Sequence, residues 1–116
     1  MLKAYRVSCS NCRNSYLVKY GAVKKKENYE IFSCPKCKNL FSVSLNSPLE
    51  CRECKNKDLE KYNPNKKQNL AYYEKMFKEG NLEARNYTEL KKYWRSIKDK
   101  KCPNCHENKL VWEEVN

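Results

Sequence analysis

The sequence predicts a small α+β protein that is stabilised by bound metal. All the cysteines fall into four Cys-x-x-Cys pairs, short runs of β-branched and aromatic residues flank these pairs, and two stretches with helical periodicity lie between the last two pairs. The eight cysteines are Cys9, Cys12, Cys34, Cys37, Cys51, Cys54, Cys102 and Cys105.

The Cys-x-x-Cys turn, or knuckle, is a typical metal-binding element. One knuckle presents two thiolates to one ion, and a second knuckle completes a closed tetrahedron. The four knuckles therefore predict two structural Zn²⁺ ions per chain. With 116 residues split between two sites, neither half has a large core, whereas structural zinc contributes on the order of 10 kcal/mol of apparent binding free energy per site.

Other uses of the cysteines fit the sequence less well. The first residues contain no apolar leader, which argues against a secreted disulfide scaffold and favours a cytoplasmic protein. A thioredoxin-like pair needs a βαβ pattern that is not visible. Cys102-Pro-Asn-Cys105-His106 matches the c-type haem pattern, but His106 is the only histidine and haem attachment requires export. An iron–sulfur cluster would use the same thiolates and stays an alternative to zinc.

The N-terminal third reads as a ribbon of short strands. A β-branched or aromatic run precedes and follows each of the first two knuckles, and a polar loop lies between them. The predicted strands centre on residues 5–7, 16–18, 29–32 and 40–43.

The stretch from Tyr5-Arg6-Val7-Ser8-Cys9-Ser10-Asn11-Cys12 to Phe32-Ser33-Cys34-Pro35-Lys36-Cys37 resembles a short prokaryotic zinc-ribbon family over about residues 3–45. The resemblance implies that Cys9, Cys12, Cys34 and Cys37 bind one zinc ion. It implies little about a substrate or partner. Ribbons often carry glycine directly after each knuckle, and this chain departs from that pattern with Arg13, Lys38, Lys55 and His106.

The remainder reads as a second zinc ribbon interrupted by two helices. Residues 58–62 and 109–115, which follow the last two knuckles, resemble a pair of strands. Asn63-Pro64 is expected to open a first helix that ends at Gly80, and Thr88 to cap a second helix. The predicted fold is thus a pair of tandem zinc ribbons, with domains at residues 1–47 and 48–116 and a helical insertion at about 64–100.

Three pairings of the knuckles are possible. Sequential pairing closes loops of 21 and 47 residues, nested pairing 13 and 89, and crossed pairing 38 and 64. The loop-closure entropies of the first two pairings differ by only ~0.1 kcal/mol. The strand pattern and the family resemblance favour sequential pairing, and nested pairing stays open because residues 34–54 would also make an acceptable ribbon.

The charge distribution suggests a polyanionic partner. The formal net charge is +11, and two zinc–thiolate sites would leave the folded protein near +7. Residues 61–101 carry twelve basic and five acidic residues. Basic surfaces bind nucleic acid by releasing counterions from phosphates. The lysine-rich composition of an AT-rich genome explains the same excess without selection for binding.

Two basic surfaces are candidates for nucleic-acid contact. The second helix carries Lys91, Lys92, Arg95 and Lys98 beside Tyr93 and Trp94. The loop of the first ribbon carries Lys24, Lys25 and Lys26, with Lys19 nearby. The alternative is that Tyr93, Trp94 and Ile97 dock the helix onto the second ribbon while both sets of lysines only face solvent, and for the aromatic residues we favour this docking.

Catalytic constellations are not visible. A single histidine and two glycines leave no Ser-His-Asp set and no glycine-rich phosphate loop, and no apolar run spans a membrane. We therefore expect a non-enzymatic protein without a membrane partner or small-molecule substrate, an accessory or regulator of transcription or another DNA or RNA transaction. The alternative is a phage-type adaptor or inhibitor that docks on another protein through the helical insertion.

Overall fold

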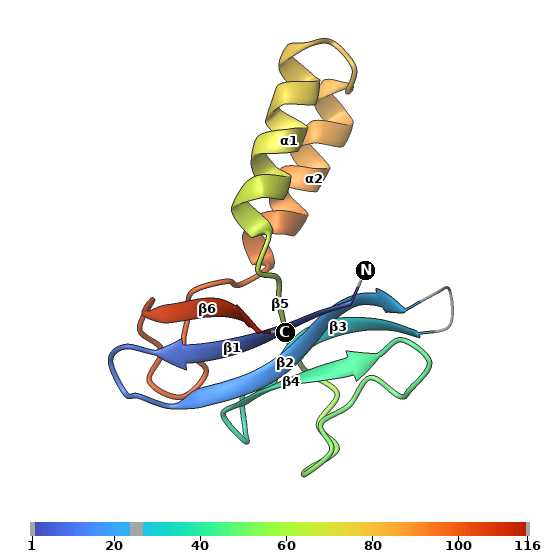
Figure 1. Cartoon of the computed structure of the whole chain (residues 1–116). Coiled ribbons are helices and arrows are strands. Elements are labelled where there is room, and N and C mark those ends of the chain that lie inside the picture. The colour runs from blue at the N-terminus through green and yellow to red at the C-terminus, as the bar shows by residue number, and fades with distance from the viewer. Residues whose placement is uncertain (1, 24–26, 116) are drawn as a thin grey trace.

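The computed structural model describes residues 2–23 and 27–115 and contains one sheet and two helices (Figure 1). The predicted small α+β fold is confirmed. The candidate residues Lys24, Lys25 and Lys26 lie outside the described residues. The elements in chain order are β1 (Lys3–Cys9), β2 (Ser15–Val23), β3 (Glu27–Cys34), β4 (Asn39–Ser44), β5 (Glu60–Tyr62), α1 (Lys66–Lys78), α2 (Ala84–Ser96) and β6 (Leu110–Val115).

The strands form a six-stranded sheet in the order β4-β3-β2-β1-β6, with β5 paired to β3. Each strand pair is antiparallel. The four strands predicted in the N-terminal third are confirmed. The two predicted strands of the second unit also form, but their expected pairing with each other is wrong: β5 pairs with β3, and β6 pairs with β1.

Strand β5 takes the place of β2 along one edge of β3. Near the start of β3, Tyr29 pairs with Gly21 of β2, whereas two residues later Ile31 pairs with Tyr62 of β5. The opposite edge of β3 carries β4 throughout this stretch. Because one strand edge accepts one partner at a time, β2 and β3 must separate before they reach their knuckles. The sheet therefore holds the first two knuckles apart.

The core lies where these strands meet. Val7, Val18, Ile31, Tyr62 and Leu110 are all buried in one cluster with two of the cysteines. Tyr62 is fully buried, and its hydroxyl donates a hydrogen bond of 2.7 Å to the Lys101 carbonyl oxygen. Burial raises the pKa of Tyr62 well above its usual range, so the hydroxyl stays protonated and keeps donating this bond. The short strand β5 thus supplies the largest fully buried side chain.

The two helices form an arm that projects from the sheet (Figure 1). Neither helix contains a buried residue. Aromatic rings hold the helices together: Phe77 stacks on Tyr87 with ring centroids 4.5 Å apart, and Tyr73 lies 6.5 Å from Trp94. The predicted docking of Trp94 onto the second ribbon is therefore wrong, because its ring packs on the partner helix.

The base of the arm is attached to the sheet by residues around β5. Ile97 is buried, as docking would require, and Lys98 forms a β-bridge with Tyr62. The Lys61 ammonium lies 3.1 Å from a carboxylate oxygen of Glu30 and 2.9 Å from the hydroxyl of Tyr93. The arm is thus held at its base and is open to solvent along its length.

The predicted helix starts need correction. The second helix begins at Ala84 and not at Thr88, whose hydroxyl donates to the Ala84 carbonyl oxygen inside the helix. The first helix begins at Lys66, because the side chain of the buried Asn63 accepts a hydrogen bond from the N–H of Asn65 and holds a turn before the helix. In the described part of the chain, neither helix has the length and apolar character needed to cross a membrane.

The residue after each knuckle adopts a left-handed backbone conformation. The φ angles range from 54° to 65° at these four positions, which are Arg13, Lys38, Lys55 and His106. Glycine adopts this conformation without strain, whereas residues with a Cβ pay about 1–2 kcal/mol for it. This explains why glycine is common at this point of zinc ribbons, and it shows that the fold tolerates strain here.

Arg13 provides a test of this strain. We expect Arg13→Gly to change the free energy of unfolding by less than about 1 kcal/mol, because relief of strain offsets the greater chain entropy of glycine. Arg13→Val should lower the same free energy by at least about 1 kcal/mol, since a β-branched residue fits this conformation worst. Denaturant titration of the zinc-loaded variants measures both values, and equal stability of the two variants would contradict the assignment.

Candidate metal centres and nucleic-acid interface

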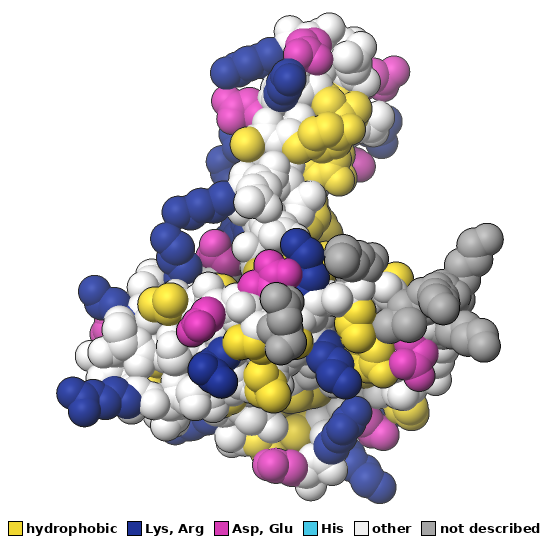
Figure 2. All heavy atoms as spheres, in the orientation of Figure 1, with side chains coloured by type: hydrophobic (Ala, Val, Ile, Leu, Met, Phe, Trp, Pro, Cys, Tyr) yellow, Lys and Arg dark blue, Asp and Glu magenta, His cyan; other side chains and the backbone are white. Residues whose placement is uncertain are grey.

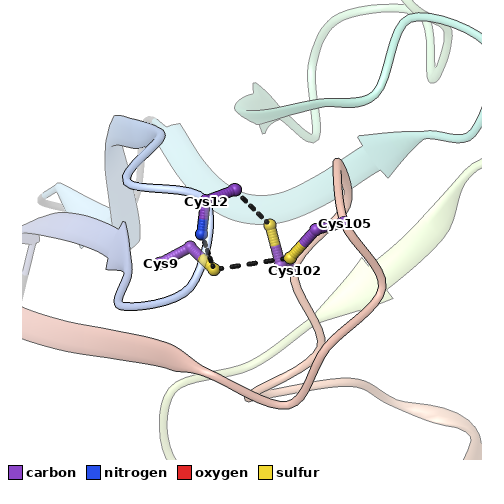
Figure 3. A group of neighbouring side chains, drawn as sticks. All are labelled: Cys9, Cys12, Cys102 and Cys105. Atoms are coloured by element: carbon purple, nitrogen blue, oxygen red, sulfur yellow. Dashed lines mark hydrogen bonds between the residues drawn. The ribbon is translucent and has the colours of Figure 1, made fainter.

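The cysteines form two groups of four. Site 1 contains Cys9, Cys12, Cys102 and Cys105, and site 2 contains Cys34, Cys37, Cys51 and Cys54. In each group all four Sγ atoms lie within 4.8 Å of one another. Figure 3 shows site 1, where the knuckle between β1 and β2 faces the knuckle that precedes β6.

This arrangement is the nested pairing, so the sequential pairing is wrong. The ligand set implied by the family resemblance, Cys9 and Cys12 with Cys34 and Cys37, is not formed. The physical reason is the strand arrangement: β5 separates β2 from β3, and β6 pairs with β1 so that Cys9 lies opposite Leu110. Both sites combine one knuckle from each side of the predicted boundary between residues 47 and 48. The division into two domains stays a prediction.

The sulfur geometry fits one tetrahedral zinc ion per site. The closest contacts across site 1 are 3.6 Å from Cys9 to Cys105 and 3.6 Å from Cys12 to Cys102. Those across site 2 are 3.5 Å and 3.7 Å. A tetrahedron with Zn–S bonds of about 2.3 Å has edges of about 3.8 Å, whereas a disulfide bond is about 2.05 Å long. The two groups therefore have the donor atoms and spacing of two structural zinc sites.

The backbone shapes all four knuckles in the same way. The N–H of the residue after each knuckle donates to the carbonyl oxygen of its first cysteine, at 2.8–2.9 Å. In the first knuckle, the N–H of Cys12 also points at the Cys9 sulfur at 3.4 Å. Such N–H···S bonds stabilise a thiolate and so prepare it for a metal ion. The left-handed residues close these turns.

Asparagine side chains connect the two knuckles of each site. In site 2, the Asn56 amide donates to the Cys34 sulfur at 3.6 Å, and the Asn39 amide lies 4.0 Å from the Cys51 sulfur. In site 1, the Asn11 amide and then the Glu107 N–H lower the pKa of the Cys105 thiol to about 6. The asparagines that recur around the knuckles thus support the metal ligands from a second layer, a role that the sequence reading did not assign.

The predicted nucleic-acid contacts fall on two separate parts of the molecule. Lys19 is exposed on β2, on the sheet. Lys92 and Arg95 are exposed on α2, and the ammonium of Lys91 lies 5.6 Å above the ring of Tyr87. Lys98 lies beyond the end of α2, where its backbone bonds to β5. The structure therefore keeps three predicted cations together on the arm and leaves Lys19 apart from them.

Lys19 lines a groove between strand β2 and the hairpin formed by β3 and β4. The groove has a volume of about 370 Å³, and the residues that line it include Leu17 and Lys19 of β2, Tyr29 of β3, Ser42 of β4, and Arg52. The Lys19 ammonium lies 5.9 Å above the Tyr29 ring. The space-filling view shows Lys and Arg side chains beside apolar ones on the sheet face turned to the viewer (Figure 2).

The two cations of this groove have no carboxylate partner among the described residues. The carboxylate of Glu27 is bound to the Tyr29 ring instead, since it accepts a 2.6 Å hydrogen bond from the Tyr29 hydroxyl. This bond raises the pKa of Tyr29. Sequence reasoning missed Tyr29 and Arg52, because Arg52 lies within a knuckle and Tyr29 reads as an ordinary strand residue.

The nested pairing predicts which thiols lose protection together. In the variant Cys102→Ser/Cys105→Ser, we expect Cys9 and Cys12 to react with an alkylating reagent while Cys51 and Cys54 stay protected, and zinc content to fall from two ions to one per chain. Mass spectrometry of the alkylated peptides and elemental analysis measure these outcomes. Sequential pairing would instead expose Cys51 and Cys54, and iron in the wild-type protein would contradict the zinc assignment.

Neither a family model, nor a curated protein, nor a solved structure matches this chain.

Proposed function

We propose that this chain is a non-enzymatic, cytoplasmic, two-zinc protein that binds nucleic acid, as an accessory or regulator of transcription or another DNA or RNA transaction. The observation that carries the proposal is the groove, where Lys19 and Arg52, which have no carboxylate partner among the described residues, lie with the ring of Tyr29. The cytoplasmic location is supported by cysteines that form metal-type groups and no disulfides in the described residues.

The groove combines the two groups that nucleic acid requires. Ammonium and guanidinium groups neutralise phosphates, and aromatic rings offer a surface for base stacking. The excess of basic residues in the whole chain adds a long-range attraction for polyanions. Two closed four-cysteine sites leave the metal ions no position for a substrate, so the zinc serves to hold this surface in shape.

Removing the two groove cations tests the proposal. We expect Lys19→Gln/Arg52→Gln to weaken nucleic-acid binding at least about tenfold at low salt, because two phosphate contacts are lost. For the same reason, the slope of log K against log salt should fall by about 1.4 for single strands or about 1.8 for duplex DNA. Fluorescence anisotropy with labelled DNA and RNA across a salt series measures both quantities. The zinc content must stay at two ions per chain, since Arg52 lies within a knuckle.

The variant Lys92→Gln/Arg95→Gln is a matched control, because it removes the same charge from exposed positions on the arm. It should weaken binding less than the groove variant. Equal losses of affinity in the two variants would mean that binding depends on overall charge or on the arm, and not on the groove. If the wild-type protein binds no nucleic acid at low salt, the nucleic-acid proposal is wrong.

The projecting arm favours a second candidate function, an adaptor or inhibitor that docks on another protein. Tyr72 and Tyr93 are about half exposed, at 58% and 48%, so each places part of an aromatic ring on the surface of the arm. An open hollow of about 420 Å³ beside Leu82 and Leu90 adds apolar surface on α2 and the turn before it. These features resemble a binding surface more than the outside of a helix that only faces water.

A pull-down from the source cell separates the two candidate functions. If the arm is the functional surface, nuclease treatment should leave a captured protein in place, Tyr72→Ser/Leu82→Ser should release it, and Lys19→Gln/Arg52→Gln should not. Quantitative mass spectrometry of the captured proteins measures this pattern. Loss of all captured proteins on nuclease treatment would contradict the adaptor function.

A further inference from the structure

We infer that the groove takes single-stranded nucleic acid, with an unpaired base against Tyr29 and the adjoining phosphates at Lys19 and Arg52. This inference rests on the proposed function and specifies its ligand. The arrangement combines both kinds of contact in one concavity of about 370 Å³, which is a volume typical of small-molecule pockets.

The groove is built from strands that are fixed against each other. The backbone N–H of Lys19 on β2 donates a 2.6 Å hydrogen bond to the Ser42 hydroxyl on β4. This bond crosses from one half of the sheet to the other and ties the two groove walls together. The walls therefore present their side chains at a set spacing, and a bound base meets a preformed surface.

A concave surface lined by an aromatic ring can distinguish single strands from duplexes. In a duplex the base faces are stacked on each other. A duplex can therefore present only its phosphates and the base edges in its grooves to a concave protein surface. A single strand can turn a base outward and stack it on an aromatic ring while its backbone follows the cations. The ring contacts are therefore available to a single strand alone.

Lys19 is placed so that its ammonium can move from the Tyr29 ring to a phosphate when a base binds. In the free protein its ammonium lies 5.9 Å above the Tyr29 ring, near the outer limit of a cation–π contact. The lysine side chain has four rotatable carbons, so it can move from the ring to a phosphate when a base arrives. Arg52 is also close enough to Tyr29 for its charge to lower the pKa of the Tyr29 hydroxyl, against the stronger effect of Glu27.

Paired binding measurements on the full chain test the inference. Fluorescence anisotropy compares labelled 12-nucleotide single strands of DNA and RNA with the DNA duplex of the same sequence, at one salt concentration. We expect at least one single strand to bind at least about tenfold more tightly than the duplex. Tyr29→Leu should remove about tenfold of the single-strand affinity and leave duplex affinity within about twofold, because it keeps apolar bulk and loses the ring.

Tyr29→Phe is the matched control, since it keeps the ring and removes only the hydroxyl bond to Glu27. It should bind single strands as the wild-type protein does. If Tyr29→Leu loses zinc, Tyr29→Met replaces it in the same comparison. Duplex binding as tight as single-strand binding, or equal losses for both ligands in the ring variants, overturns this inference and leaves the proposed function standing. No binding of any strand overturns both.

Discussion

The cross-link at site 1 is the constraint on which the core and the joining of the two chain ends depend. It joins the knuckle after β1 to the knuckle before β6, and so closes a loop of 89 residues that contains site 2 and the whole arm. Two of its cysteines, Cys9 and Cys102, are buried in the same cluster as Val7 and Tyr62, so the metal site is part of the core and not an attachment to it. A sheet with few buried side chains gains from one zinc site an apparent binding free energy on the order of 10 kcal/mol, which is comparable to the whole stability of an ordinary domain.

Local features of this chain could be predicted from the sequence, and the pairing of distant segments could not. The knuckles, the strands of the N-terminal third and the two helices all carry signals that span a few residues. The choice between sequential and nested pairing depends on where the three-residue strand β5 pairs, which is along β3. The sequence Glu60-Lys61-Tyr62 is too short to show a pattern that predicts its partner strand. Loop-closure entropy was nearly equal for the two pairings, so a strand too short for pattern recognition decided the result. The missed groove has the same origin, because Lys19, Tyr29 and Arg52 come from separate segments that meet only through this pairing.

The arm shows how an insertion can be stable without joining the core. Helices of 13 residues are marginal by themselves in water, and neither helix here has a buried residue. The aromatic contacts between Phe77 and Tyr87 and between Tyr73 and Trp94 supply the interface between the helices. The buried Ile97 and the bridge from Lys98 to Tyr62 then fix the base of the arm beside the core. The arm can therefore vary in its outer surface without affecting either metal site, which is why it supports a separate candidate function.

Site 2 links the metal to the groove. Arg52 stands between Cys51 and Cys54, so the ion that holds this knuckle also fixes the backbone from which the guanidinium extends. The opposite knuckle precedes β4, which supplies the Ser42 hydroxyl that ties the groove walls together. A four-thiolate zinc site adds a charge of about −2 relative to the neutral thiols, and this charge partly offsets Arg52 and weakens the local field. A groove with only two cations beside such a site attracts phosphates modestly, so aromatic contacts must carry much of any affinity for nucleic acid. This balance of charge and stacking is the physical basis for a single-stranded ligand, since the stacking contribution is the one that a duplex does not provide.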